Sequence, residues 1–387
     1  MDIIDSIKMD LSVATLKGDK SQTKTVACDY LAPLPGAVSH MQSVSHKNEI
    51  IICGMPVCYS YHVLKNQYKR ICSYPRDTIL SGYCVIKWIK SADNISLLAF
   101  GKKLKNPLVM NYISVWDEGE EHNKKIRQAI HFNEWVPLIY KSNPIYTKKH
   151  DGEVRGVIGG SKNNLLFLVC SPNRIAVLNL DTLEFDKRGV LPVGNADISD
   201  YCLVTKHDFG SKEITHIFEM VFFGKNIGLL IEYNEIQNNF QFRELWICST
   251  IRALHFYSYV HVNGAILFFG GFDGTDCSKS VHKYSIQKNQ WTKFEHTLPC
   301  GSSICDVALT EDKAYVHVIG TASVRWGSHV EHIRIKVDDW MKEDTEMERQ
   351  WKVEEEEKRK LEEIQTEIKQ MGNKIDIRAL TVDLISC

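Results

Sequence analysis

The sequence has no excess of charge of either sign and no long apolar run. Its 47 Lys and Arg residues against 48 Asp and Glu residues give a net charge of −1 over 387 residues. Nucleic-acid-binding proteins usually carry a clear basic excess, so a nucleic-acid partner is not expected. The longest apolar runs, such as residues 165–169 and 265–269, fall far short of the ~20 residues that cross a bilayer. A membrane-spanning segment is therefore not expected either.

The N-terminus lacks the basic segment and apolar segment of a secretory signal, and no two of the 12 cysteines form a C-x-x-C pair. Zinc-ribbon, RING and thioredoxin-like sites are therefore not expected. Cysteines such as Cys53 and Cys170 lie in apolar stretches and are interpreted as small buried residues. Cys58 and His62 are interpreted as two strand residues rather than metal ligands. We expect reduced thiols, a cytoplasmic location, and no cofactor or metal.

The motifs of common catalytic and nucleotide sites are also missing. The chain has no G-x-S-x-G, no P-loop and no G-x-G-x-x-G. Its histidines are scattered singly, and His317 alternates with apolar residues as a strand histidine does. No catalytic residue is assigned, and the chain is not expected to be an enzyme.

A repeated pattern is present instead, and it is clearest in residues 265–299. An apolar strand is followed by Gly270 and Gly271, and a polar loop leads to a strand that ends at Tyr284. A turn then leads to a strand opened by Trp291 and closed by Leu-Pro. Pro donates no hydrogen bond and suits the end of an outermost strand. The segment resembles a kelch repeat, whose blade has a glycine pair after its second strand and a spaced Tyr and Trp.

Weaker copies of this pattern occur along the chain. The seven-residue step from Tyr284 to Trp291 recurs between Tyr61 and Tyr68, Leu178 and Phe185, and Tyr233 and Phe240. An asparagine precedes the second aromatic residue in three copies: Asn66, Asn239 and Asn289. Asn tolerates left-handed backbone, so these residues are predicted to lie in tight hairpin turns.

The ends of the second strands set the period of the repeat. They are Gly54, Gly101, Cys170, Gly224, Gly270 and Gly320, which are 47, 69, 54, 46 and 50 residues apart. The long step contains a polar insert, residues 117–134. Six such units predict an all-β, six-bladed β-propeller of four-stranded blades. A β-sandwich with accidental spacing is the alternative.

The sixth unit has only three strands before the pattern becomes helical. Residues 28–40 align with residues 291–303 around their Leu-Pro pairs, so residues 28–36 are predicted to supply the missing outer strand. This closure leaves no blade with a free edge. The predicted organisation is a flexible segment at 1–27, a propeller at 28–337, a charged helix at 338–372 and a tail at 373–387.

Residues 338–371 contain no Gly or Pro and are rich in Glu, Lys and Arg, which predicts a helix. Trp340, Met347 and Trp351 can pack its first turns on the sixth blade. The apolar residues of its second half follow heptad steps: Leu361, Ile364, Ile368, Met371 and Ile375. This short coiled-coil pattern favours weak self-association through residues 361–375. A solvated single helix, and docking on the propeller or on a partner, are the alternatives.

Over residues 28–337 the chain is similar to kelch-repeat propeller proteins, and residues 58–75 and 266–291 resemble a large group of uncharacterised protist kelch-motif proteins. The resemblance implies a galactose oxidase-like fold and a non-catalytic scaffold or adaptor that binds a protein. Cytoskeletal proteins and ubiquitin-ligase components are the partner classes it suggests, although no BTB, F-box or RING module is recognisable. The alternative is a galactose-oxidase-like or sialidase-like propeller enzyme, but nothing in the sequence groups Arg155, Arg252 and Arg325.

The loops between second and third strands are predicted to share one face of the propeller, and loops on a rigid scaffold commonly carry binding. Two of these loops hold side chains typical of interface anchors: Phe272 and Asp273 in blade five, and Arg325 and Trp326 in blade six. We predict that these four residues form a partner-binding patch. The alternative is that Phe272 folds back on its own blade and Trp326 covers the start of the helix.

Overall fold

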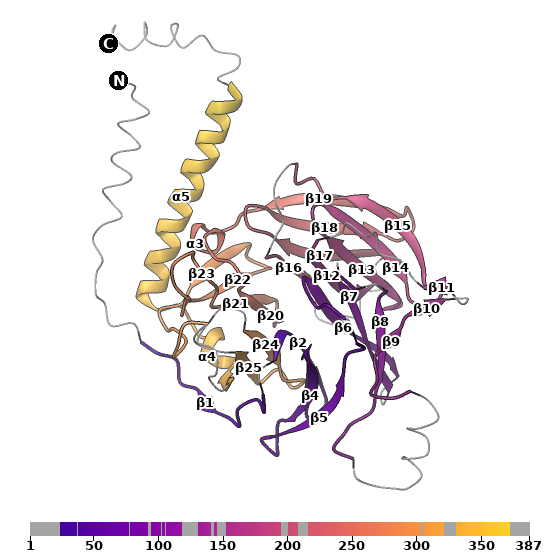
Figure 1. Cartoon of the computed structure of the whole chain (residues 1–387). Coiled ribbons are helices and arrows are strands. Elements are labelled where there is room, and N and C mark those ends of the chain that lie inside the picture. Colours follow the sequence, from indigo (N-terminus) through magenta and orange to yellow (C-terminus); the bar gives the residue numbers. More distant parts are fainter. Residues whose placement is uncertain are drawn as a thin grey trace, which may run out of the picture.

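The computed structural model describes residues 24–36, 38–76, 78–91, 94–101, 103–104, 106–117, 131–140, 143–144, 152–194, 200–207, 216–302, 305–320 and 330–371. Six antiparallel sheets of four strands each are arranged in a ring, which confirms the six-bladed propeller (Figure 1). In each of the first five blades the strands follow one another in chain order, so each blade is a simple meander.

Blade one contains β2 (Ser39–His46), β3 (Glu49–Met55), β4 (Val57–His62) and β5 (Gln67–Ser73). Blade two contains β6 (Tyr83–Ser91), β7 (Asn94–Gly101), β8 (Leu108–Tyr112) and β9 (Val136–Pro137). Blade three contains β12 (Val154–Gly159), β13 (Leu165–Cys170), β14 (Arg174–Asn179) and β15 (Glu184–Val190). A short pair, β10 (Ile139–Tyr140) and β11 (Asn143–Pro144), lies between the second and third blades in the chain.

Blade four contains β16 (Cys202–Thr205), β17 (Ile217–Phe223), β18 (Gly228–Asn234) and β19 (Asn239–Leu245). Blade five contains β20 (Ser258–Val262), β21 (Ala265–Phe269), β22 (Val281–Ser285) and β23 (Gln290–Lys293). Blade six contains β24 (Asp306–Leu309), β25 (Tyr315–Gly320), β26 (Glu331–Lys336) and, as its outer strand, β1 (Asp29–Tyr30). The helices are α3 (Ser249–Arg252), α4 (Asp338–Met341) and α5 (Glu346–Met371).

The apolar runs of the sequence are the second strands, because these strands are covered by a neighbouring blade on each face. All residues of β13 and β21 are buried, whereas exposed and half-buried residues alternate along the outer strand β15. A strand buried on both faces reads as a continuous apolar run, and a half-solvated strand alternates. The packing of adjacent blades therefore explains the periodic pattern of the sequence.

The glycine pair of blade five is required by backbone geometry. Gly270 and Gly271 have φ angles of 65° and 107°. A Cβ atom on Gly270 would lie 2.2 Å from the carbonyl oxygen of Ser302, and the backbone N–H of Gly271 donates to that same oxygen at 2.7 Å. Only glycine has the freedom for such a φ together with so close an approach.

The hairpin turns before the outer strands place an asparagine in left-handed backbone, as the sequence predicts for Asn66 and Asn289, with φ angles of 50° and 49°. In blade four the prediction was wrong by one residue. Asn238 has the left-handed conformation, with a φ of 49°, and Asn239 is the first residue of β19. In all three turns the asparagine side-chain oxygen accepts a hydrogen bond from the tyrosine five residues earlier: Tyr61, Tyr233 and Tyr284.

Blade six takes its outer strand, β1, from the N-terminal part of the described chain, and β1 pairs with β26. Asp29 lies opposite Arg334 of β26, and their side chains form an ion pair at 2.8 Å. Farther along, the N–H of Leu34 donates to the carbonyl of Val330 at 3.2 Å. The Leu34 side chain is buried between blades six and one. Hydrogen bonds, one ion pair and apolar burial thus join the last blade to the first.

A chain of buried polar side chains also crosses this junction. Nδ1 of His317 lies 2.8 Å from Nε2 of His332, and Nδ1 of His332 lies 2.7 Å from the hydroxyl of Tyr68 in blade one. Burial lowers the pKa of His317 to about 4 and holds the pKa of His332 well below its usual value. Neutral imidazoles, which can accept as well as donate, suit this arrangement.

After β26 the chain forms two helices rather than the single helix that was expected. A capping box starts α5: the N–H of Glu348 donates to Oγ1 of Thr345 at 3.3 Å, and the N–H of Thr345 donates to Oε2 of Glu348 at 3.1 Å. The other oxygen of Glu348 accepts the N–H of Glu295, beyond β23, at 3.1 Å. Glu348 is thus both the cap of α5 and its anchor on blade five.

The first half of α5 docks on blade five, which corrects the expected packing on the sixth blade. The ring of Trp351 lies 6.4 Å from that of His282 in β22. The buried carboxylate of Glu355 accepts hydrogen bonds from the N–H and the hydroxyl of Ser249 at 2.5 and 2.9 Å. The far half of α5 extends beyond the sheets (Figure 1).

No helix in the described part of the chain has the length and apolar character to cross a membrane.

The three residues expected to seat the helix differ in their surroundings. Trp340 is fully buried in α4, with Phe294 and Phe269 of blade five at ring distances of 4.8 and 6.1 Å. The same apolar cluster includes Ile333 of blade six, so Trp340 fills the junction of these two blades. Met347, by contrast, is exposed.

Trp291 should contribute strongly to stability, because it is only 4% exposed and its ring contacts those of Phe223, Phe268 and Tyr284. We expect Trp291→Ala to lower the free energy of unfolding by about 3–5 kcal/mol in chemical denaturation. Trp291→Phe keeps most of the ring but leaves the carbonyl of Trp246 without its 2.8 Å hydrogen bond, and should cost about 1 kcal/mol. Unchanged stability of Trp291→Ala would show that the ring is not a packing residue.

The buried histidines make stability dependent on pH. Burial lowers the pKa of His282 to about 3 and that of His317 to about 4, whereas both titrate near 6.5 in the unfolded chain. The unfolded chain therefore takes up protons that the folded chain does not, so stability is complete above pH 6.5 and is lost as the pH falls toward 4. Each such histidine contributes a loss of about 1.4 kcal/mol per pH unit.

This dependence is measured by urea denaturation between pH 7 and pH 4. We expect His282→Gln to reduce the slope of unfolding free energy against pH by about one proton. The matched change at the exposed His131 should leave the slope as it is. Equal slopes for wild type and His282→Gln would contradict the assignment.

Candidate functional site

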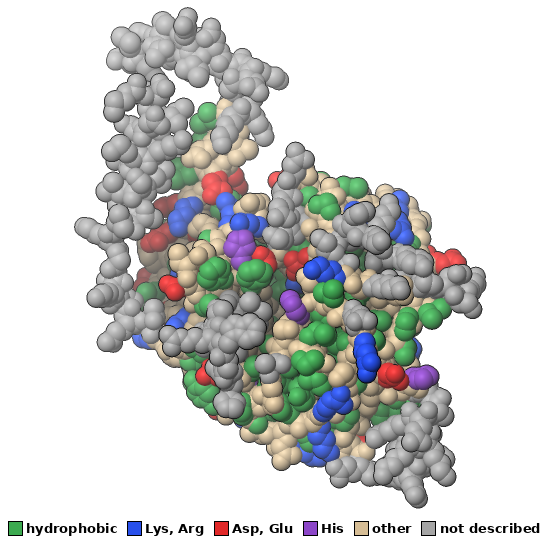
Figure 2. All heavy atoms as spheres, viewed as in Figure 1, with side chains coloured by type: hydrophobic (Ala, Val, Ile, Leu, Met, Phe, Trp, Pro, Cys, Tyr) green, Lys and Arg blue, Asp and Glu red, His purple; other side chains and the backbone are tan. Residues whose placement is uncertain are grey.

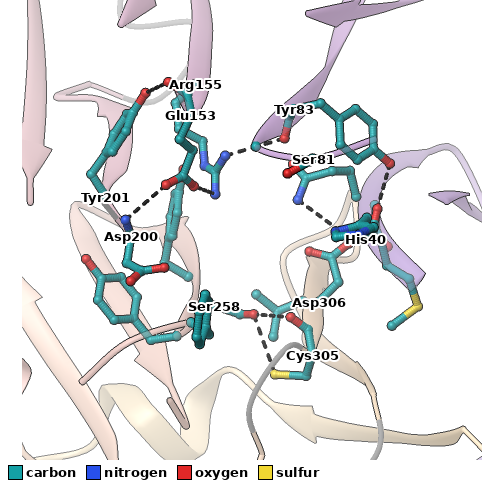
Figure 3. A pocket seen from close by; sticks show the side chains of 18 residues that line it. His40, Ser81, Tyr83, Glu153, Arg155, Asp200, Tyr201, Ser258, Cys305 and Asp306 are labelled. Carbon is teal, nitrogen blue, oxygen red and sulfur yellow. Dashed lines mark hydrogen bonds and ion pairs between the residues drawn. The ribbon is translucent and has the colours of Figure 1, made fainter. Parts of the chain in front are cut away.

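The inner strands of all six blades begin at the same end of the propeller and surround a pocket of about 430 Å³ at the mouth of the central channel. Ser258, which lines the pocket, pairs with Phe269, the last residue of β21. The loop after β21 therefore lies at this end too. The pocket is shown in Figure 3, and its lining residues are His40, Met41, Gln42, Ser43, Ser81, Gly82, Tyr83, Glu153, Arg155, Asp200, Tyr201, Phe256, Tyr257, Ser258, Tyr259, Cys305, Asp306 and Val307.

Three tyrosines at the starts of inner strands connect blades two, four and five, each to the blade that precedes it in the chain. Their hydroxyls lie within hydrogen-bonding distance of backbone carbonyls: Tyr83 of His40 and Cys53 (2.7 and 2.8 Å), Tyr201 of Glu153 and Val169 (2.6 and 2.8 Å), and Tyr257 of Phe223 (3.4 Å). Burial raises the pKa of all three hydroxyls well above the usual value, so they remain protonated donors. These hydroxyls hold the walls of the pocket in place.

Four residues on the rim have left-handed backbone. His40, Gly82, Asp200 and Phe256 have φ angles of 52°, 60°, 51° and 55°, and each stands one residue before another residue that lines the pocket. This conformation is uncommon for a residue with a side chain and is often found at binding sites. It leaves the ring of Phe256 52% exposed at the rim.

One side of the pocket carries an ion pair between Glu153 and Arg155, both from blade three (Figure 3). The second oxygen of Glu153 accepts the N–H of Asp200 at 2.9 Å. Arg155 also donates to the carbonyls of Val154 and Tyr83, at 3.0 and 3.4 Å, and so bridges blades three and two. Both charges are therefore engaged within the protein.

A second charged chain lies at the rim between blades four and five. Oδ2 of Asp200 lies 2.8 Å from Nδ1 of His255, and Nε2 of the same ring lies 3.1 Å from Nζ of Lys225. Because the Lys225 ammonium can only donate, Nε2 of His255 accepts its hydrogen bond and Nδ1 donates to Asp200, so the three side chains form a hydrogen-bonded chain.

Asp306, at the start of β24, differs from the other two carboxylates. Its oxygen Oδ2 is buried and has no hydrogen-bond partner among the described residues. It forms no ion pair with any described residue. Burial raises the pKa of Asp306 to about 6, against smaller opposing effects of hydrogen bonds from Ser43 and Val307. A carboxyl group in a cleft with a raised pKa and no ion-pair partner among the described residues is often a functional group.

Of the four residues predicted to bind a partner, the structure describes Phe272 and Asp273. Phe272 is half-buried and pairs through its backbone with His255, next to the rim. Asp273 is exposed, and its Oδ1 accepts the N–H groups of Thr275 and Asp276 at 2.8 Å each, which lowers the pKa of Asp273 to about 2. Asp273 therefore shapes its own loop. Arg325 and Trp326 lie outside the described residues.

Sequence reasoning did not identify the pocket, because its lining comes from six segments spread over more than 260 residues of the chain. One local signal could have indicated it: a tyrosine stands two or three residues before the apolar part of three inner strands, at Tyr83, Tyr201 and Tyr257. The three arginines considered for a sialidase-like site are not grouped where they are described. Arg155 is the only arginine among the described lining residues, and Arg252 pairs with Glu362 of α5 at 2.8 Å.

The described residues include no group of three His, Cys, Asp or Glu side chains that could hold a metal ion. On the face drawn in Figure 2, acidic and basic side chains are interspersed.

Residues 253–295, which include the four strands of blade five, match the family model of the kelch motif. A solved structure entitled "Structure of YjhT" has a TM-score of 0.53 at 13% sequence identity, and the alignment covers 80% of this chain and 97% of that one. A likeness at this identity concerns the fold alone. Among curated proteins no match is found.

Proposed function

We propose that this kelch-type propeller is a non-catalytic interaction module that binds a protein partner at the mouth of its central channel. The observation that carries the proposal is the pocket itself, to which all six blades contribute. Its tyrosine hydroxyls and the Glu153–Arg155 pair are engaged in holding the walls, which leaves them unsuited to proton transfer. The exposed ring of Phe256 supplies an apolar contact beside the pocket.

The free cysteines fit a reducing, cytoplasmic environment, which we include in the proposal. Every cysteine among the described residues is free, and most of them are buried. The partner classes that the kelch resemblance suggests, cytoskeletal proteins and ubiquitin-ligase components, remain candidates.

A propeller enzyme is the second candidate, and Asp306 is the observation that favours it. A carboxyl group with a raised pKa in a cleft can act as a general acid. Catalysis by Asp306 would require a second group that acts as a base or a nucleophile. Glu153 is another carboxylate of the pocket, but it is held by Arg155 and by the N–H of Asp200. We therefore favour binding over catalysis.

The binding face is tested by proximity labelling in the native cell, followed by affinity measurement with the partner so identified. We expect Phe256→Asn, in which Asn tolerates the left-handed backbone, to weaken partner binding more than tenfold with a melting temperature within a few degrees of wild type. Arg325→Ala combined with Trp326→Ala should have the same effect if the predicted patch extends to blade six.

The matched control is Ile236→Asn. Ile236 is 72% exposed in the turn between β18 and β19, at the opposite end of the propeller. Loss of binding in this variant, with full binding in Phe256→Asn, would move the site to the other face.

We also propose weak self-association through the far half of α5. Leu361, Ile364 and Ile368 lie at heptad spacing and are each more than half exposed. The last described ion pair between α5 and the propeller is at Glu362, so the apolar stripe continues past the docked part of the helix. Two heptads give little binding energy, which is why the association is expected to be weak.

Sedimentation velocity over a range of concentrations tests this association. We expect the wild-type protein to show a mass that rises with concentration, and Leu361→Glu with Ile368→Glu to remain monomeric. Val353→Glu, an exposed position of α5 outside the stripe, is the control and should behave as wild type. A wild-type protein that stays monomeric at the highest concentration would contradict the proposal.

A further inference from the structure

The carboxylates of the pocket differ in what balances them. Glu153 is paired with Arg155, and Asp200 accepts a hydrogen bond from His255, whose other ring nitrogen lies 3.1 Å from the ammonium of Lys225. Asp306 has no ion-pair partner among the described residues. Arg155, the one arginine among the described lining residues, is already engaged by Glu153 and by two backbone carbonyls. The pocket as described therefore presents an excess of negative charge that is concentrated at Asp306.

Asp306 is one of the residues that line the pocket. The residue as a whole is partly buried, although its Oδ2 is covered, and Figure 3 shows its carboxylate beside His40, across the pocket from Glu153 and Arg155. An ionised carboxylate that is removed from water without a counter-ion is costly, and a cation bound against it would offset that cost. The unpaired carboxylate thus destabilises the free protein, and a positively charged ligand would offset this free-energy cost.

The remaining lining suits the body of an extended side chain. Tyr257 and Tyr259, both half-buried, are among the lining residues, and aromatic rings attract cations over their faces. A volume of about 430 Å³ is near the lower end of ligand pockets, about 300–1,000 Å³, and fits a side chain better than a larger group. An anionic ligand would meet Asp306 and Asp200 with no free cation to receive it among the described lining residues.

We propose that the pocket receives one cationic side chain, the ammonium of a lysine or the guanidinium of an arginine, from the bound partner, with Asp306 as its counter-ion. This inference rests on the proposed binding function and adds the chemistry of the residue that is recognised. Asp306 is a binding residue in this scheme, and the Glu153–Arg155 pair holds the opposite wall.

Binding of a cation is linked to the protonation of Asp306. A bound cation favours the ionised carboxylate, so binding releases a proton when Asp306 is protonated in the free protein. Affinity is therefore highest above pH 7 and falls as the pH is lowered toward 5. The other titratable and charged groups that face Asp306 around the pocket are His40, Tyr83, Glu153, Arg155, Asp200, Tyr201, Tyr257, Tyr259 and Cys305. A His40→Gln variant separates any contribution of that imidazole.

The test uses the full chain and small probes: Nα-acetyl-lysine N-methylamide, its arginine analogue, and the norleucine and glutamate analogues as neutral and acidic controls. Binding is followed by NMR chemical-shift titration. We expect saturable binding of the lysine or arginine probe that weakens at least tenfold from pH 7.5 to pH 5.0. The norleucine and glutamate probes should not bind.

Asp306→Asn should weaken binding of the cationic probe at least tenfold and, because it removes an unpaired buried charge, should raise the melting temperature at pH 7.5. Asp276→Asn makes the same change of charge at an exposed position on the same face, and should do neither. If Asp306→Asn does not fold, the pH dependence of probe binding to the wild-type and His40→Gln proteins decides the question.

Equal binding of the lysine and norleucine probes, or undiminished lysine-probe binding by Asp306→Asn, would overturn the proposal. The outcome is separable from that of the proposed function. Partner binding that depends on Phe256 but not on Asp306 would leave the binding face intact and remove the cationic contact. If the cationic probe binds but partner binding does not depend on Phe256, the cation site in the pocket is supported and the proposed partner-binding face is contradicted.

Discussion

The propeller ring is closed by the pairing of β1 with β26, which joins the last blade to the N-terminal segment that leads into the first. Only two residues of β1 pair with β26, but three further interactions stabilise this junction. Asp29 and Arg334 form an ion pair, Leu34 is buried between blades six and one, and a neutral chain from His317 through His332 reaches Tyr68. Without this closure both end blades would expose an apolar face and a strand edge.

Closure also determines the pocket at the channel mouth, because only a closed ring brings six inner strands around one axis. The tyrosine hydroxyls that lie near the carbonyls of a preceding blade keep the walls in register. Within those walls Glu153 is paired with Arg155 and Asp200 is hydrogen-bonded to His255, whereas Asp306 has no ion-pair partner among the described residues. Stability alone does not require a partly buried, unpaired carboxylate, and this is why Asp306 is the residue that the scaffold leaves available for a ligand.

The C-terminal helix adds a second, separate surface. Its first half belongs to the propeller, since Glu348 and Glu355 place their buried carboxylates on backbone N–H groups of blade five and of α3. Its second half carries Leu361, Ile364 and Ile368 in solvent. One helix thus has a docked part governed by hydrogen bonds and a free part governed by apolar spacing.

The sequence alone determined the blades. Its apolar runs are second strands buried on both faces, and the glycine pair of blade five marks a backbone that no side chain permits. Local signals were less exact where neighbouring residues are alike, as when Asn239 was chosen in place of Asn238. The sequence did not reveal that Thr345 and Glu348 divide the helix, or that Trp351 and Glu355 belong to blade five, because these depend on which blade lies under the helix. The pocket was decided by tertiary structure alone. Four charged residues at or next to the starts of inner strands line it: Glu153, Arg155, Asp200 and Asp306. They lie far apart in the sequence, and only closure of the ring brings them together around one channel and partly shields them from water.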